Sequence, residues 1–157
     1  MESVGGSRDV IGNGIELLQQ RHGPFPVNQT TLSLSPDAYD AAVERACDGF
    51  ADVYVRVEND DGEVLHVQGE DRRRVPRCVG GSETPLSERA RDAVKDATGV
   101  SCTIDGIVRV TIAGVRNAED TDAETVYRLL VLADATYDGG QAERGVWRVD
   151  PKIPEFV

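Results

Sequence analysis

The sequence lacks three features that would place the protein in other classes: paired cysteine–histidine motifs, long apolar runs and a secretory signal. The three cysteines, Cys47, Cys78 and Cys102, are widely spaced and form no Cys-x-x-Cys pair, and the two histidines are isolated. This pattern argues against a zinc site and fits a reduced, cytoplasmic compartment. No apolar run approaches the ~20 residues of a membrane-spanning helix, and the N-terminus has no charged-then-apolar pattern, so we expect no membrane association.

Lysine is also scarce, whereas acidic residues are abundant. Lys95 and Lys152 are the only lysines among 17 basic residues, and 28 acidic residues bring the net charge to -11. Acid-rich, lysine-poor surfaces are similar to those of cytosolic proteins from extreme halophiles, in which carboxylates maintain solubility in molar salt. An ordinary acidic protein is the alternative. The charge argues against binding to nucleic acid.

Several catalytic motifs are missing as well. The sequence contains no P-loop, no G-x-S-x-G, no H-E-x-x-H and no G-x-G-x-x-G after a strand.

At 157 residues the chain is long enough for one domain with a real core. We predict an N-terminal extension over residues 1–50, which packs on the sheet as a cap, and a main domain over residues 51–157.

The extension carries clear local signals. Residues 8–21 show a helical apolar pattern, and residues 28–34 alternate as in a strand. Ser35 and Pro36 then fit the N-cap and first position of a helix. Residues 37–47 continue this helix with an apolar face of Tyr39, Ala42, Val43 and Ala46.

The main domain alternates strands with one strong helix. Strands are expected over residues 52–57, 63–68, 102–112, 124–136 and 145–149, with an acidic loop over residues 114–122. Residues 80–100 read GGSETPLSERARDAVKDATGV. In this stretch Leu86, Ala90 and Val94 form an inward apolar stripe, and Gly99 fits a left-handed helix end.

Residues 80–100 resemble the Nudix box, G-x5-E-x7-R-E-U-x-E-E-x-G-U, where U is aliphatic. Thr98-Gly99-Val100 matches the end of the pattern and Val94 matches its inner aliphatic position. In this register Asp92 replaces the arginine, Asp96 replaces one glutamate of the last pair, and Ala93 and Ala97 replace two further glutamates. The loop before the helix is shorter than the pattern, with Glu83 near the early glutamate position.

The resemblance implies the Nudix sandwich, an α/β fold with a mixed sheet and helices on both sides. The N-terminal block around residues 21–49 also looks similar to an extension on haloarchaeal Nudix proteins. In Nudix enzymes the box carboxylates hold Mg²⁺ or Mn²⁺ against a diphosphate. Here Asp96 is the main candidate for metal binding and catalysis, and Glu88 and Asp92 complete an i, i+4, i+8 acidic stripe with it. We favour a solvated face over a metal site for this stripe.

A basic cluster precedes the double glycine. Arg72, Arg73, Arg74 and Arg77 could grip a phosphate or nucleotide together with Gly80 and Gly81, and pairing with the chain's own carboxylates is the alternative.

Two functional hypotheses follow from this comparison. The first is a Nudix-fold module with an eroded box, weakly active or non-catalytic, that binds a nucleotide-like ligand or a protein partner. The second is an active Mg²⁺-dependent hydrolase of nucleoside diphosphate-linked substrates, in which Glu83 or Glu143 could supply substitute ligands. The alanines at positions 93 and 97 favour the first hypothesis, because the loss of positioned charge at a catalytic site costs orders of magnitude in rate.

Overall fold

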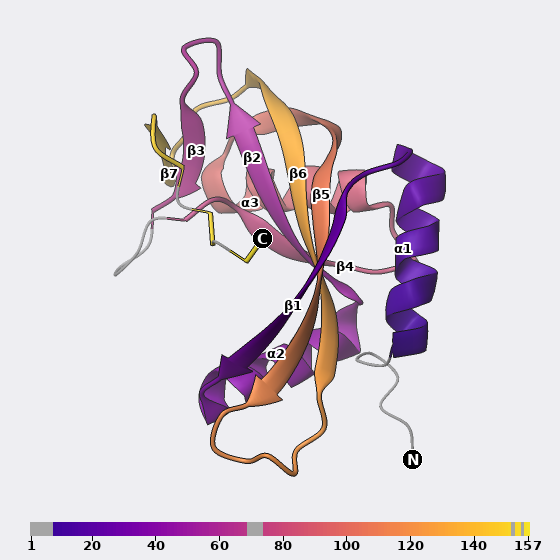
Figure 1. Ribbon diagram of the computed structural model, residues 1–157. Helices are drawn as coiled ribbons and strands as arrows, with labels where there is room; N and C mark the ends of the chain where they lie inside the picture. The colour runs from indigo at the N-terminus through magenta and orange to yellow at the C-terminus, as the bar shows by residue number, and fades with distance from the viewer. Residues whose placement is uncertain (1–7, 69–73, 152, 155) are drawn as a thin grey trace.

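The computed structural model describes residues 8–68, 74–151, 153–154 and 156–157. The elements follow in the order α1 (Arg8–His22), β1 (Val27–Leu34), α2 (Pro36–Asp48), β2 (Ala51–Glu58), β3 (Val64–Val67), β4 (Arg77–Gly80), α3 (Leu86–Thr98), β5 (Ser101–Asn117), β6 (Val126–Gly139) and β7 (Gly145–Arg148) (Figure 1). Within these residues, none of the helices has both the length and the apolar character needed to cross a membrane.

The strands form one mixed sheet in the order β1-β5-β6-β2-β3-β7, and β4 pairs with β2 beside β3. β5 and β6 are antiparallel, whereas β6 runs parallel to β2 from Ala51↔Leu129 to Glu58↔Thr136. The other edge of β2 is shared: β4 pairs with its first half and β3 meets it at Glu58. β4 therefore lies beside the sheet centre and leads directly into α3.

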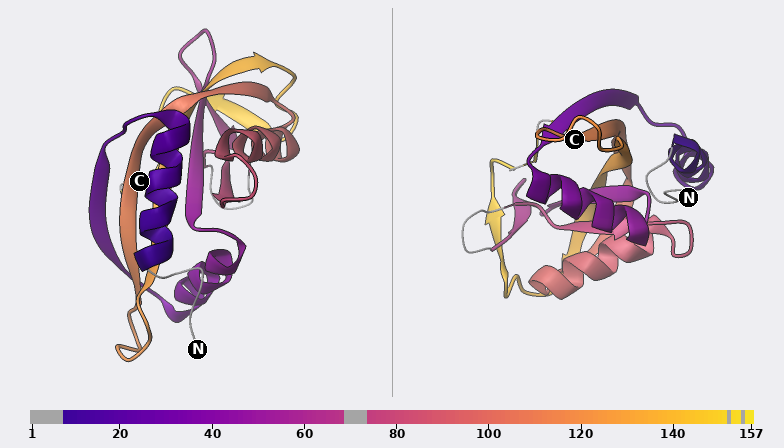
Figure 2. Two further views of the ribbon diagram at one scale, coloured as in Figure 1. Left: turned by 90° about the vertical axis from the view of Figure 1, so that its right-hand side faces the viewer. Right: turned by 90° about the horizontal axis from the view of Figure 1, so that it is seen from below.

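Helices cover both faces of the sheet, which confirms the predicted α/β class (Figure 2). α1 and α3 pack on one face, where Leu18 and Val94 join Val53, Val55 and Val131 in the larger core. α2 and the C-terminal residue pack on the other face in a second core with Leu130 and Leu132. The alternation of inward side chains along β2 and β6 explains how both cores share the same strands.

The N-terminal segment contributes a strand to the same sheet. β1 pairs in parallel with β5 from Val27↔Val110 to Leu34↔Asn117. The side chain of Ser35 accepts a hydrogen bond from the Ala38 amide at 3.3 Å, which confirms the predicted cap of α2. The division at residue 50 stays a prediction, although the first 50 residues supply both sheet and core.

The long antiparallel pair differs from the sequence-based expectation. The predicted loop over residues 114–122 was wrong at its start, because β5 continues through residue 117 against β6. β6 likewise runs past the predicted strand end to Gly139. Cross-strand pairing outweighs the local turn signals at both sites. Val43, predicted to lie on the apolar face of α2, has an exposed side chain instead.

Candidate functional site

α3 has the orientation that its apolar pattern predicted. Leu86, Ala90 and Val94 are buried in the larger core, and the helix ends at Gly99, whose φ of 85° is left-handed. The Gly99 amide donates to the Lys95 carbonyl at 2.8 Å. Since this apolar stripe faces the sheet, the direction of every other α3 side chain is set by helical geometry.

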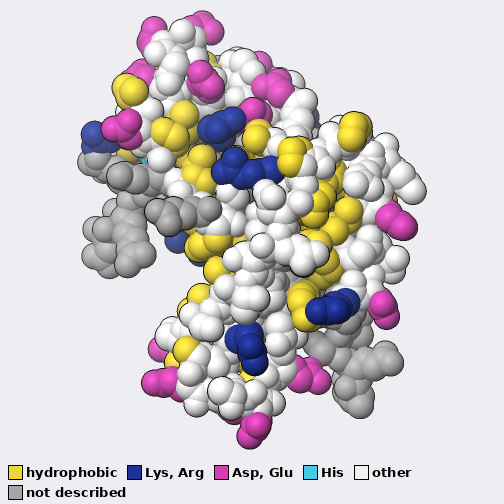
Figure 3. All heavy atoms as spheres, in the orientation of Figure 1, with side chains coloured by type: hydrophobic (Ala, Val, Ile, Leu, Met, Phe, Trp, Pro, Cys, Tyr) yellow, Lys and Arg dark blue, Asp and Glu magenta, His cyan; other side chains and the backbone are white. Residues whose placement is uncertain are grey.

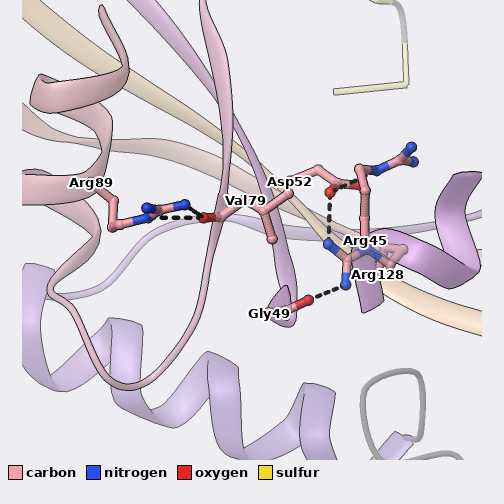
Figure 4. Close-up of polar contacts among 6 residues, drawn as sticks. All are labelled: Arg45, Gly49, Asp52, Val79, Arg89 and Arg128. Atoms are coloured by element: carbon pink, nitrogen blue, oxygen red, sulfur yellow. Dashed lines mark hydrogen bonds and ion pairs between the residues drawn. The ribbon is translucent and has the colours of Figure 1, made fainter. Parts of the chain in front are cut away.

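Two arginines that sequence reasoning missed anchor α3. Arg89 directs its Nε and one terminal nitrogen to the Val79 carbonyl of β4, at 3.3 and 3.0 Å (Figure 4). Arg144, in the segment before β7, donates to the Asp96 carbonyl at 2.9 Å. Each guanidinium satisfies a backbone acceptor, and neither contact has a local signal, because the partners are brought together by the fold.

The predicted acidic stripe points to solvent. Glu88, Asp92 and Asp96 are exposed, whereas Ala93 and Ala97 are half-buried. Among the described residues, no group of three or more His, Cys, Asp or Glu side chains could hold a metal ion. The residues present therefore do not fit the divalent cation that a Nudix box implies, since a hard cation needs several converging oxygen ligands. Catalytic and metal roles for these three residues stay predictions.

The substitute carboxylates, Glu83 and Glu143, are both open to solvent. Glu83 is exposed in the loop before α3. Glu143 is exposed beside Gly99 and lies 3.7 Å from Arg144, in a contact open to solvent. Such exposed ion pairs contribute little to stability.

Gly49 permits a close approach of two backbones beside the double glycine of residues 80 and 81. A Cβ atom added at Gly49 would lie 2.2 Å from the Gly80 carbonyl oxygen and 3.1 Å from the Gly81 nitrogen. Residue 49 therefore has to be glycine for the turn after α2 to contact the turn before α3. A ligand-binding role for Gly80 and Gly81 stays a prediction.

A buried ion pair lies next to this contact. Arg128 on β6 is fully buried and directs one terminal nitrogen to Asp52 at 2.6 Å, while its other terminal nitrogen donates to the Gly49 carbonyl. Arg45 from α2 is a second cation on Asp52, with its Nε 3.1 Å from the carboxylate (Figure 4). The pair thus connects β2, β6 and the end of α2, which the sequence did not indicate.

The arginine cluster is described only in part, because Arg72 and Arg73 lie outside the described residues. Arg74 and Arg77 are exposed, and within the described part of the chain neither forms an ion pair with a carboxylate. The positive charge of Arg77 is the main cause that lowers the pKa of Arg74. Arg77 lies opposite Tyr54 in the β2–β4 pair, where burial raises the pKa of the phenol and the positive charge of Arg77 opposes that rise.

A polar pocket of about 240 Å³ lies at the C-terminal end of β2, between residues of β2, β5 and β6. Its lining includes the carboxylates of Glu58, Asp60, Asp105 and Asp134. Asp134 pairs with Arg56 at 2.7 Å, and Thr136 donates to Asp105 at 2.6 Å. Figure 3 shows several acidic side chains, in magenta, at the top of the molecule, where the β2–β3 turn lies. The acidic side chains at this end of the sheet disfavour phosphate binding, in contrast to the exposed Arg74 and Arg77 at the start of β4.

The chain is similar in fold to Nudix hydrolases of known structure. A UDP-X diphosphatase aligns with 64% of this chain at 14% identity and a TM-score of 0.48, and this chain spans half of that protein's length. A Nudix hydrolase from Nitrosomonas europaea aligns over 64% of this chain and 72% of its own, at 13% identity and a TM-score of 0.49. A pyrophosphohydrolase from Bacillus subtilis aligns over 69% and 66%, at 18% identity and a TM-score of 0.42.

No protein-family model matches the sequence, and no curated protein matches it. At these identities and TM-scores, the structural matches describe a shared part of the fold and assign no activity.

Proposed function

We propose that this chain is a Nudix-fold protein with an eroded box that binds a nucleotide-like ligand through Arg74 and Arg77 at the start of β4, with little or no metal-dependent hydrolysis. The observation that carries the proposal is the contrast between two neighbouring groups. Arg74 and Arg77 expose positive charge that no described carboxylate neutralises, whereas the α3 carboxylates are spread along a solvated face.

The exposed arginine pair supports an anionic ligand. Two guanidinium groups close enough for one to lower the pKa of the other repel each other, and a phosphate between them would remove that repulsion. Guanidinium groups bind phosphate through paired, charge-assisted hydrogen bonds. In a chain with a net charge of -11, an unneutralised basic pair is unusual enough to suggest selection for an anion.

The composition of α3 supports weak or absent catalysis. A rotation of the helix that aimed its carboxylates at the sheet would expose Leu86, Ala90 and Val94, each at most 2% exposed now. Burial of aliphatic side chains contributes about 25 cal/mol per Å², so such a rotation is strongly disfavoured. Positions 93 and 97 are half-buried, between the core side and the solvent side of α3. Both are alanine, so neither supplies a carboxylate to a metal ion.

The ligand is tested by calorimetric titration of the folded protein with ADP-ribose and nucleoside diphosphates in molar KCl. Arg74→Gln should weaken binding at least tenfold, because a charge-assisted hydrogen bond contributes about 1.5–3 kcal/mol. Arg116→Gln, which removes the same charge from an exposed position of β5, is the matched control. Equal affinities of the two variants, or no binding by any nucleotide, would refute the arginine site and leave a protein partner as the ligand class.

Catalysis is tested separately. Phosphate release from the same compounds, with and without Mg²⁺ or Mn²⁺, should stay near the uncatalysed rate. Metal-dependent turnover that is lost in Asp96→Ala would overturn the proposal in favour of the active hydrolase.

A further inference from the structure

β1 forms an outer edge of the sheet. It pairs with β5 on one side, and no described strand pairs with its other side. Figure 2 shows β1 along the margin of the molecule, away from α3. Its odd-numbered residues are exposed, and even Val27 is 40% exposed.

The hydrogen bonds at the two ends of β1 show which backbone groups face outward. The Pro26 carbonyl accepts from Val110 at 3.0 Å, and the Leu34 carbonyl accepts from Ala118 at 2.8 Å. In a strand the N–H and C=O of one residue point to the same side, and successive residues point to opposite sides. The even-numbered residues therefore face β5. Four residues present their N–H and C=O to the open side: Val27, Gln29, Thr31 and Ser33.

Among the residues that the structure describes, none protects this edge against strand pairing in the usual ways. Sheet edges are normally blocked by charged side chains, prolines, bulges or a covering helix. Residues 23–36 contain no charged side chain, although 29% of the whole chain is charged. The prolines of this stretch stand outside β1, at positions 24, 26 and 36. The strand itself is uncharged over all eight residues, regular and accessible.

We propose that β1 is a self-association edge, at which two copies of this chain pair their β1 strands antiparallel about a two-fold axis through Thr30. The outward residues are symmetric about position 30. This register places Val27 opposite Ser33 of the second copy and Gln29 opposite Thr31, so that all eight outward backbone groups form hydrogen bonds. A shift of the register by two residues would leave end groups of this set without a partner within β1.

The charge distribution explains why a second copy fits this edge. Each chain carries a net charge of -11, so most contacts between two copies would bring carboxylates together. An approach through β1 joins two uncharged strands instead. In this register Leu32 and Leu34, half-buried against the α2-side core, would lie opposite the uncharged residues Asn28 and Pro26 of the second copy. Because the remaining repulsion is screened by salt, the dimer should be favoured in molar KCl.

The test combines sedimentation velocity with amide exchange. The protein should change from monomer to dimer between micromolar and millimolar concentrations in molar KCl, and more weakly at low salt. In the monomer, NMR should show fast exchange at Gln29 and Thr31, whose amides face outward, and slow exchange at Thr30 and Leu32, whose amides face β5. Dimer formation should slow the two outward amides at least tenfold.

A matched pair of exposed substitutions locates the interface. Gln29→Lys places a solvated ammonium on the edge and should raise the dimer dissociation constant at least tenfold, whereas Gln141→Lys makes the same change near the end of α3 and should not. A protein that stays monomeric at millimolar concentration in molar KCl would overturn the inference. So would a dimer that responds equally to both variants, or one whose Gln29 and Thr31 amides still exchange rapidly.

Discussion

Removal of one partner from the Asp52–Arg128 pair should destabilise the protein far more than removal of both. The side chain of Arg128 is 0% exposed and that of Asp52 is 7% exposed. Because water does not solvate these two charges, each is stabilised mainly by its ion pair with the other. Asp52→Val leaves a buried guanidinium with the Gly49 carbonyl as its remaining acceptor, and this should cost about 3–5 kcal/mol. Arg128→Met should cost less, because Arg45 still lies 3.1 Å from the carboxylate and is partly open to solvent.

The double variant Asp52→Val/Arg128→Met removes both charges and keeps an apolar volume, so it should be more stable than Asp52→Val alone. Urea unfolding of the four proteins, followed by the fluorescence of the single tryptophan, Trp147, gives the coupling free energy. A loss of about 3–5 kcal/mol is a large part of the usual free energy of unfolding of about 5–15 kcal/mol. If Asp52→Val alone does not fold, the recovery of a folded protein in the double variant therefore also demonstrates the coupling. Additive losses, or an Asp52→Val cost below about 1 kcal/mol, would refute the reasoning.

Two further predictions concern glycines and thiols. Gly49→Ala should destabilise the fold by about 1–3 kcal/mol, because its Cβ would lie 2.2 Å from a backbone carbonyl oxygen. Gly12 lies in helix α1, and a Cβ added there would meet no described atom of another part of the fold within 4 Å. Gly12→Ala should therefore stabilise the protein by about 0.5–1 kcal/mol, and thermal unfolding compares the two variants. A thiol reagent at pH 8 should label only Cys47, since burial raises the pKa of Cys78 and of Cys102 to about 11. Labelling of all three thiols without denaturant would contradict the burial of the Cys78 and Cys102 thiols.

The elements defined by local signals were predicted well. Ser35 caps α2 and Gly99 ends α3 as expected, because caps and left-handed positions depend on a few adjacent residues. The inward stripe of α3 was predictable for the same reason: helical periodicity places Leu86 and Val94 on one side whatever they pack against. The order of strands was not derivable from these signals, because it depends on pairing between distant segments.

The candidate site was predictable mainly in what it lacks. The alanines at positions 93 and 97 are visible in the sequence, and the exposed direction of Asp96 follows from the apolar stripe. The anchoring of α3 by Arg89 was not predictable, because its acceptor at Val79 belongs to a separate strand. Arg128 likewise stands in an apolar run of sequence, which gives no indication of its partner.

The sequence by itself determined the helices and their caps, which depend on residue types at short spacing, and the net charge of -11, which depends on composition alone. Tertiary structure alone decided which charges are neutralised and which backbone groups remain open. Asp52 and Arg128 are 76 residues apart, and only the parallel pairing of β2 with β6 brings them within 2.6 Å. The same pairing order leaves β1 at the edge, where an uncharged strand becomes a surface.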